Sequence, residues 1–341
     1  MISPFVDGFL ETAIGPIPRV ATILSRLDHL GTFGARTGFT RDNYKVTPGL
    51  YCVGNPAGSS PVLVTANYKL TFDALRKELA GIDCWILVID TRGINVWCAG
   101  GKGTFSAEEV AFQVQRAKLD KLVSHRELIL PQLSANGVAA RDVKKLCGFK
   151  ARFGPILAAR LPEFLQTGKA REDMRAVTFN FRERAALVPL EICLLWKHLL
   201  VAGLLFFFLS GISPEVFSKA AAQSRGATLI LATLTAILAG AALTPLFLPW
   251  IPFRQFWLKG ALLGGLSSIF FVAGTTTASP VEKLALILWI SGCASYLAMN
   301  FTGATPFTSL SGVAKEMRKG LPFQIITAAL ALMFWLAEPF I

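Results

Sequence analysis

Five long apolar stretches in the C-terminal half of this 341-residue chain limit the possible folds most strongly. A helix needs roughly 20 apolar residues to cross about 30 Å of hydrocarbon, and each stretch is close to that length. The stretches lie at residues 188–210, 226–249, 257–277, 283–303 and 321–340. We therefore expect an all-α transmembrane domain of five helices over residues 187–341.

The charged residues are concentrated before these stretches. Residues 1–186 contain 25 Lys and Arg and 17 Asp and Glu, whereas residues 187–341 contain 9 and 5. A hydrophobic content of 53% is too high for an ordinary soluble enzyme. The sequence therefore predicts one soluble domain over residues 1–186 joined to the membrane domain, and no nucleic-acid partner is expected.

Basic residues in the short loops predict the orientation of the expected spans. Lys and Arg gather before the first span, between the second and third, and between the fourth and fifth: Lys169, Arg171, Arg175, Arg182, Arg184, Arg254, Lys259, Lys315, Arg318 and Lys319. This distribution favours a multi-pass protein of the cytoplasmic membrane, with the N-terminal domain in the cytoplasm and the C-terminus outside. The spacing Gly260 to Gly264 in the third span is typical of close helix packing.

Residues 61–181 alternate between strand-like and helix-like patterns. Strands are expected at 61–65, 84–90, 127–133 and 176–181, and helices at 70–79, from Ser106, and at 138–146. Ser106 and Glu109 have the spacing of a capping box. Alternation of this kind predicts a parallel, Rossmann-like α/β sheet.

The segment that follows the most apolar strand is the place to look for a ligand, because such sheets bind ligands beyond the carboxyl ends of their strands. It contains Cys98, Trp97, three glycines and Lys102 within seven positions. A Walker phosphate loop is excluded, because Val96 and Gly103 occupy its first and last positions. Two interpretations remain from the residues themselves: Cys98 and Trp97 as core residues beside a glycine turn, or Cys98 as a soft thiolate ligand or nucleophile.

The octapeptide Asn95–Lys102, Asn-Val-Trp-Cys-Ala-Gly-Gly-Lys, resembles the cap-helix signature of the HgcA family, the corrinoid proteins of microbial mercury methylation. The resemblance includes residues 43–51, residues 300–317 and the five-span tail. It also includes Pro61–Asp73, a segment shared with the corrinoid iron–sulfur proteins of the acetyl-CoA pathway.

The resemblance implies a domain that binds a cobalamin-type corrinoid, with Cys98 as the lower axial ligand of cobalt and as the catalytic residue. It implies that the helix shapes or caps the corrinoid through Asn95, Val96, Trp97, Ala99, Gly100, Gly101 and Lys102. Thr65 and Asn67 end a strand on the ligand-facing edge, where they are expected to touch the corrinoid or to form a local turn.

The activity implied by the resemblance is corrinoid-dependent methyl transfer to Hg(II), forming methylmercury. The implied partners are a folate methyltransferase as methyl donor and the ferredoxin-like iron–sulfur protein HgcB as reductant, with the Hg(II) held by another thiolate. The histidines are consistent with Cys98 as the cobalt ligand, because none of His29, His125 and His198 lies in the Asp-x-His-x-x-Gly motif of histidine-ligated cobalamin proteins. A thiolate is a soft, electron-rich ligand for such a metal.

Two other functions stay open at this point. The first is a membrane-anchored corrinoid carrier whose methyl acceptor is another metal or a thiol. The second, of a different class, is a transporter with a cytosolic α/β regulatory domain, which predicts a phosphate loop and charges in mid-membrane. The sequence assigns no role to residues 1–40 or 300–317.

Overall fold

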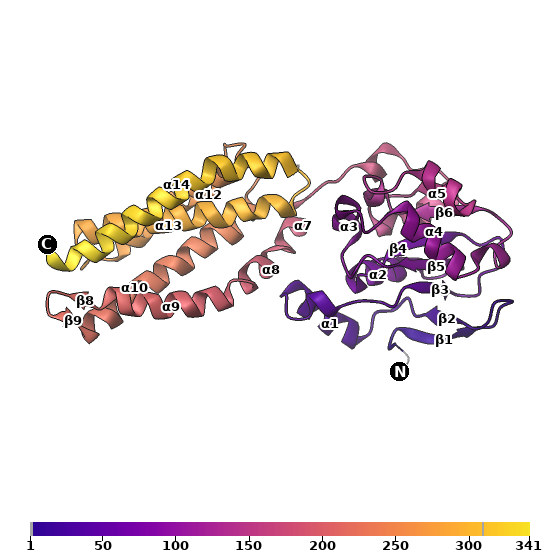
Figure 1. Ribbon diagram of the computed structural model, residues 1–341, viewed down its shortest axis with the longest axis horizontal. Coiled ribbons are helices and arrows are strands. Elements are labelled where there is room, and N and C mark those ends of the chain that lie inside the picture. Colours follow the sequence, from indigo (N-terminus) through magenta and orange to yellow (C-terminus); the bar gives the residue numbers. More distant parts are fainter. Residues whose placement is uncertain (1–2, 309) are drawn as a thin grey trace. The chain divides into compact units, whose positions relative to one another are not determined.

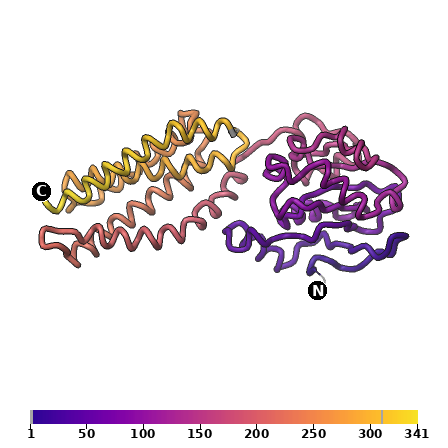
Figure 2. Tube along the Cα trace, in the orientation of Figure 1, coloured from indigo at the N-terminus to yellow at the C-terminus, as the bar shows by residue number. Residues whose placement is uncertain are grey.

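The computed structural model describes residues 3–308 and 310–341, and it divides into two compact units (Figures 1 and 2). The first unit is Met1–Val177 and the second is Thr178–Ile341. The first unit is a mixed α/β domain, and the second consists mainly of long apolar helices.

A seven-stranded sheet forms the centre of the first unit, in the order β1-β2-β3-β5-β4-β6-β7. The strands are β1 Val6–Leu10, β2 Ile17–Val20, β3 Gly49–Val53, β4 Val62–Ala66, β5 Cys84–Ile89, β6 Glu127–Leu130 and β7 Lys150–Phe153. Strands β5, β4, β6 and β7 are parallel, as the alternation predicted. β3 pairs antiparallel with β5, and β1 pairs antiparallel with β2, so the sheet is mixed rather than wholly parallel.

Helices cover both faces of this sheet, because the central strands are apolar on both sides. In β5, Trp85, Leu87 and Ile89 pack in one core cluster, and the residues between them pack in the other. The first face is covered by α3 Val96–Lys102, α4 Ala107–Arg116 and α5 Ala140–Cys147. The second is covered by α2 Lys69–Arg76 and α6 Leu161–Thr167. A further helix, α1 Arg26–Arg36, contacts α2.

Two local predictions need correction. The expected strand at 176–181 is absent: this segment has no regular structure until α7, Phe181–Ala185, begins, and Phe179 has a left-handed φ of 45° that a strand does not accommodate. The Ser106 hydroxyl does cap α4 by accepting the Glu109 N–H, but the Glu109 carboxylate accepts from the Asp90 N–H instead of completing a capping box.

Among the described residues of the second unit, four helices are long and apolar enough to cross a membrane, at Lys219–Leu246, Phe256–Gly274, Pro280–Ala304 and Ser311–Phe340. They include α10 Lys219–Ile237, α12 Phe256–Gly274, α13 Pro280–Asn300 and α14 Leu310–Ala337. As the glycine spacing predicted, α12 packs closely on α13: a Cβ on Gly260 would lie 2.5 Å from the Ala294 carbonyl oxygen.

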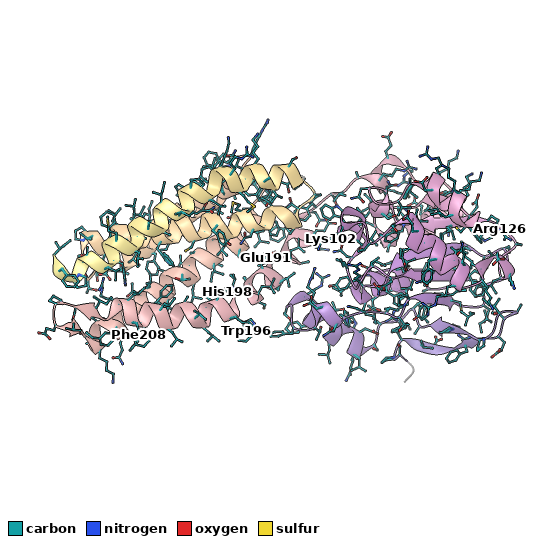
Figure 3. The ribbon with its side chains drawn as sticks, in the orientation of Figure 1. Lys102, Arg126, Glu191, Trp196, His198 and Phe208 are labelled. Carbon is teal, nitrogen blue, oxygen red and sulfur yellow. The ribbon has the colours of Figure 1, made fainter. Side chains whose placement is uncertain are left out.

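The first expected span is broken. Its residues form α8 Val188–Cys193 and α9 Trp196–Ser210, and the segments Phe181–Cys193 and Trp196–Ser210 are bent by 48°. Counting this pair as one span gives five, and otherwise there are four. Side chains on the outer surface of α9, such as Phe208, are exposed and apolar (Figure 3), which suits contact with lipid. Ser309, within the segment 300–317, lies outside the described residues.

Candidate functional site

The octapeptide singled out from the sequence forms α3, a short helix that follows β5. The helix begins where the Asn95 side chain accepts a hydrogen bond from the Cys98 N–H at 2.8 Å, so Asn95 is the N-cap. It ends at Gly103, whose φ of 73° is the left-handed conformation that glycine adopts most easily. Asn95 therefore fixes the backbone of Cys98 in the first turn.

The loop that leads into α3 is held by Asn67 from the end of the neighbouring strand β4. The Asn67 side-chain oxygen accepts hydrogen bonds from the Thr91 N–H, the Thr91 hydroxyl and the Gly93 N–H at 2.9–3.0 Å. Its amide group donates to Asp90 at 3.0 Å. Asn67 is buried, and its side chain is directed into this loop. It therefore positions the loop and does not present its side chain to a ligand.

The inner face of α3 needs small residues. Val96, Ala99 and Gly100 are buried. A Cβ on Gly100 would lie 2.5 Å from the Asn136 side-chain oxygen, and one on Gly137 would lie 2.6 Å from the Gly100 carbonyl oxygen. Gly100 is therefore explained by close packing of the helix on the loop before α5.

The outer face of α3 is open and carries Trp97, Cys98, Gly101 and Lys102. Trp97 and Cys98 are half-buried, and Gly101 is exposed. Lys102 is exposed as well (Figure 3). No atom lies within 4 Å of the position that a Cβ on Gly101 would take, and its φ is not positive. Neither packing within the chain nor backbone strain accounts for glycine here, although glycine destabilises a helix by about 0.5–1 kcal/mol relative to alanine.

Cys98 differs from the other cysteines of this unit in its surroundings. Cys52 and Cys84 are fully buried in strands, and burial raises the pKa of their thiols to about 11 and about 12, so both remain protonated at neutral pH. Burial also raises the pKa of the Cys147 thiol, which donates to the Val143 carbonyl. Cys98 instead stands on the open face of α3, one turn before Gly101.

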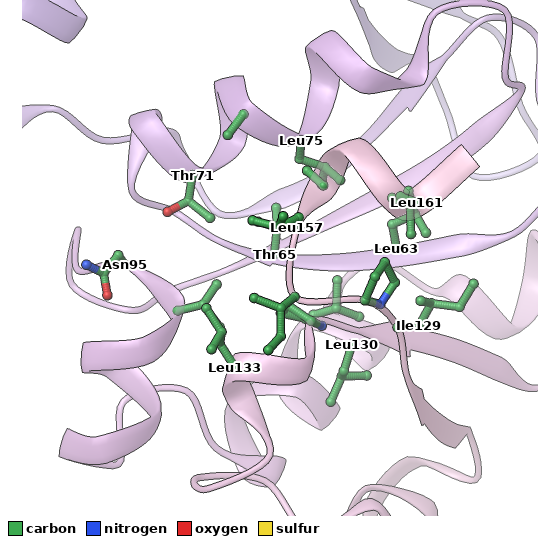
Figure 4. Close-up of a pocket in the computed structure, with 18 of the residues that line it drawn as sticks. Leu63, Thr65, Thr71, Leu75, Asn95, Ile129, Leu130, Leu133, Leu157 and Leu161 are labelled. Carbon is green, nitrogen blue, oxygen red and sulfur yellow. The ribbon is translucent and has the colours of Figure 1, made fainter. Parts of the chain in front are cut away.

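A largely apolar pocket of about 410 Å³ adjoins α3 at the carboxyl ends of β4 and β6 (Figure 4). Thr65 lies in its wall, together with Asn95, Val96 and Trp97. The opposite wall comes from α2, through Thr71 and Leu75, and from the segment after β7, through Leu157 and Leu161. The volume is at the lower end of the range for sites that enclose a small molecule.

The pocket thus brings together four of the ten residues singled out from the sequence: Thr65, Asn95, Val96 and Trp97. Cys98, Gly101 and Lys102 lie on the adjoining open face of α3, and Ala99, Gly100 and Asn67 lie behind it. Sequence reasoning missed the part of the pocket wall that follows β7, because it missed β7 itself. The short strand carries two charged residues, Lys150 and Arg152, and so lacks a continuous apolar run.

No group of three or more His, Cys, Asp and Glu side chains is placed to hold a metal ion, within residues 3–308 and 310–341.

The region around this site is similar to subunits of known acetyl-CoA synthase and acetyl-CoA decarbonylase/synthase complexes. Residues 39–165 match the family described as the CO dehydrogenase/acetyl-CoA synthase delta subunit. The individual relatives are instead named as gamma subunits of the acetyl-CoA decarbonylase/synthase complex. The relative from Methanopyrus kandleri is 38% identical over 128 residues, which cover 37% of this chain and 27% of that protein.

Two further gamma subunits extend the comparison. The gamma 2 subunit from Methanosarcina thermophila is 37% identical over 180 residues, covering 48% of this chain and 37% of that protein. The relative from Archaeoglobus fulgidus is 31% identical over 128 residues, covering 37% of this chain and 27% of that protein. The chain thus spans 27–37% of the length of these relatives, and the matched family segment includes β3 to β7 and α3.

Proposed function

We propose that the N-terminal unit binds a cobalamin-type corrinoid against the open face of α3, with Cys98 as the axial ligand of cobalt. The observation that carries this proposal is the empty space over Gly101, one helical turn from Cys98. A flat macrocycle can approach a helix closely only where no side chain stands between them. The similarity to acetyl-CoA decarbonylase/synthase subunits supports it, because the segment Pro61–Asp73 resembles the corrinoid iron–sulfur proteins of that pathway.

The remaining residues fit such a group. A corrin macrocycle is too large for a pocket of about 410 Å³, so we propose that it lies over Trp97, Cys98 and Gly101 with one edge or substituent in the pocket. Thr65 offers a hydroxyl in an otherwise apolar wall, and Lys102 is exposed where an acidic or amide substituent can reach it. Val96, Ala99 and Gly100 hold the helix in place from behind.

When bound, the corrinoid supplies a cobalt centre that carries a methyl group between a donor and an acceptor. The protein's own task is to present one soft, electron-rich sulfur in a fixed position, which favours donation of electron density to the metal. Asn95 fixes the backbone at Cys98, and Asn67 fixes the loop before it, so the thiol stands on a short but well-held helix.

We further propose Hg(II), held by another thiolate, as the methyl acceptor, with methylmercury as the product. This step rests on the resemblance of Asn95–Lys102 to the HgcA signature. The same resemblance leads us to propose two partners, a folate methyltransferase and the iron–sulfur protein HgcB. The apolar helices and the distribution of basic residues support a multi-pass protein of the cytoplasmic membrane, with its N-terminal unit in the cytoplasm.

Visible absorption spectroscopy of the full chain in detergent, loaded with cobalamin, tests the ligand. The wild type is expected to give a base-off spectrum, in which the nucleotide base of the cofactor does not bind cobalt. The same spectrum is expected to contain a thiolate–cobalt band. Cys98→Ala is expected to lose that band, whereas Cys147→Ala, which removes another half-buried thiol of the same unit, is expected to keep it. A chain that binds no corrinoid, or a Cys98→Ala spectrum equal to that of the wild type, would overturn the proposal.

A second assay tests the acceptor. The loaded chain is supplied with a methyl donor and reductant and then with either Hg(II) or a small thiol. Formation of methylmercury that depends on Cys98 supports the mercury proposal. Transfer to the thiol alone would instead favour the carrier function with another acceptor.

A further inference from the structure

The outward surface of α1 is apolar to a degree that the rest of the first unit does not match. Leu27, Leu30 and Phe33 lie on one face of the helix and are 64–66% exposed. Ile23 before the helix and Phe39 after it are 84% and 75% exposed. We call these five residues the α1 patch. Exposed apolar side chains scattered singly are normal, but a contiguous set on one helix indicates a contact surface.

The inward surface of α1, by contrast, carries a charge. Asp28 is buried and pairs with Lys69 at 2.6 Å and with Arg76 at 2.8 Å. The ring of Tyr44 lies against Gly31, where a Cβ would be 2.4 Å from its hydroxyl oxygen. The helix is therefore firmly attached by polar contacts and presents its apolar side outward, which is the reverse of an ordinary surface helix.

The charges around the α1 patch are mainly positive. Arg26 and Arg36 are exposed on the helix itself. Asp42 is the exposed acidic residue in this region, since Asp28 is buried in its ion pairs. Leucine and phenylalanine on one side of a helix with arginines around them are typical of helices that lie in the headgroup region of a membrane.

We propose that the α1 patch inserts into the surface of the bilayer that the C-terminal helices cross, and that Arg26 and Arg36 contact the phosphates of anionic lipids. Covalent linkage to membrane-spanning helices keeps the N-terminal unit near the bilayer, so even a weak surface contact would be occupied most of the time. Anionic lipids attract basic residues near a membrane surface, which suits the positive surroundings of the patch. The proposal rests on the membrane-spanning role of the second unit and is independent of the corrinoid.

Photocrosslinking in the full chain, reconstituted into lipid nanodiscs, tests this contact. The photoreactive residue p-benzoylphenylalanine is placed at Leu30 or at Phe33. The matched control is the same residue at Phe112, a half-exposed aromatic position on α4 in the same unit. After irradiation, mass spectrometry identifies what is attached. We expect lipid adducts at positions 30 and 33, several-fold more abundant than at 112, and more abundant in discs that contain phosphatidylglycerol than in discs of phosphatidylcholine alone.

Amide hydrogen exchange of the unlabelled chain gives a second measurement that needs no substitution. The amides of α1 are expected to exchange more slowly in discs with phosphatidylglycerol than in discs without it, because lipid contact stabilises the helix.

Three results would overturn the proposal. They are adducts at 30 and 33 with protein instead of lipid, equal lipid yields at 30, 33 and 112, and exchange of α1 that is independent of lipid charge. A chain that does not enter nanodiscs would refute the membrane-spanning role together with the α1 contact. A chain that enters nanodiscs but gives no lipid adducts at positions 30 and 33 would refute the α1 contact alone.

Discussion

Replacement of Gly101 by alanine is expected to have opposite effects on the stability of α3 and on its proposed binding of the corrinoid. Apart from the neighbouring residues and the backbone of α3 itself, no atom of the described residues lies within 4 Å of the new Cβ, and the backbone is helical, so the methyl group causes no clash there. Alanine is then favoured over glycine by about 0.5–1 kcal/mol. For a unit of this size we expect the melting temperature to rise by roughly 1–4 °C, or at least not to fall.

Binding of cobalamin by the same variant should weaken. A methyl group forced into a well-packed contact costs about 1–3 kcal/mol, which corresponds to a rise in Kd of roughly 5- to 150-fold. The assay is a titration of the full chain with cobalamin, followed by visible absorption, beside a thermal melt of the same sample. Gly100→Ala is the contrast: its Cβ would lie 2.5 Å from the Asn136 side-chain oxygen, so it should lower stability. Unchanged Kd values for both Gly101→Ala and Gly101→Leu would refute a ligand on this face.

Four further predictions concern stability, and chemical denaturation measures each. Asp28→Ala should lower the free energy of unfolding by about 3–5 kcal/mol, because it leaves Lys69 and Arg76 buried with one carboxylate between them; an effect below 1 kcal/mol would contradict this. Burial opposes ionisation of Asp28, but hydrogen bonds, chiefly from Lys69, outweigh it and hold its pKa far below the usual range. The stability that Asp28 contributes is therefore full above about pH 4 and lost at lower pH, and the pH dependence should shrink in Asp28→Asn. Asn67→Ala should cost about 1–3 kcal/mol by leaving the loop before α3 without its acceptor, whereas equal stability would deny the positioning role. Gly137→Ala should cost a similar amount, because the added Cβ would lie 2.6 Å from a carbonyl oxygen of α3, and a stable variant would show that the loop can move.

The parts of the fold that the sequence predicted are those whose pattern is local. Cys84–Ile89 is apolar throughout because both of its faces are covered, and this run could be recognised without any partner. The edge strand Val6–Leu10 is half-exposed, contains Gly8 and lacks a continuous apolar run, so nothing marked it as a strand. The antiparallel direction of Gly49–Val53 depends on pairing with β5 and is not encoded in its own residues.

Two apolar segments differ from the regular elements that their sequence predicts, each for a physical reason. The residues before α7 are apolar because Phe179 packs with Leu248, Phe256 and Phe301 in a core cluster of the helical unit, not because they form a strand. The stretch 188–210 is apolar enough for a span, but the chain bends between Cys193 and Trp196. Hydropathy measures only composition and does not detect such a bend.

For the candidate site, the resemblance of Asn95–Lys102 supplied the short helix that carries Cys98, whereas the residues alone left Cys98 open as a core residue or a ligand. The sequence could not show that the face with Cys98 is open, because that depends on which distant segments pack nearby. Nor could it show that the Asn67 side chain turns toward Thr91 and Gly93, a contact across two strands that lie side by side only after folding.

The ion pairs of Asp28 determine which N-terminal residues a truncated form of this protein must retain. The segment that matches the known family begins at residue 39, and a fragment drawn to that likeness would omit β1, β2 and α1. Such a fragment would keep Lys69 and Arg76 but lose one of the two carboxylates that neutralise them, and it would expose the side of β3 that pairs with β2. The segment that matches the family model and the folding unit therefore do not coincide, and the N-terminal residues belong to the folding unit.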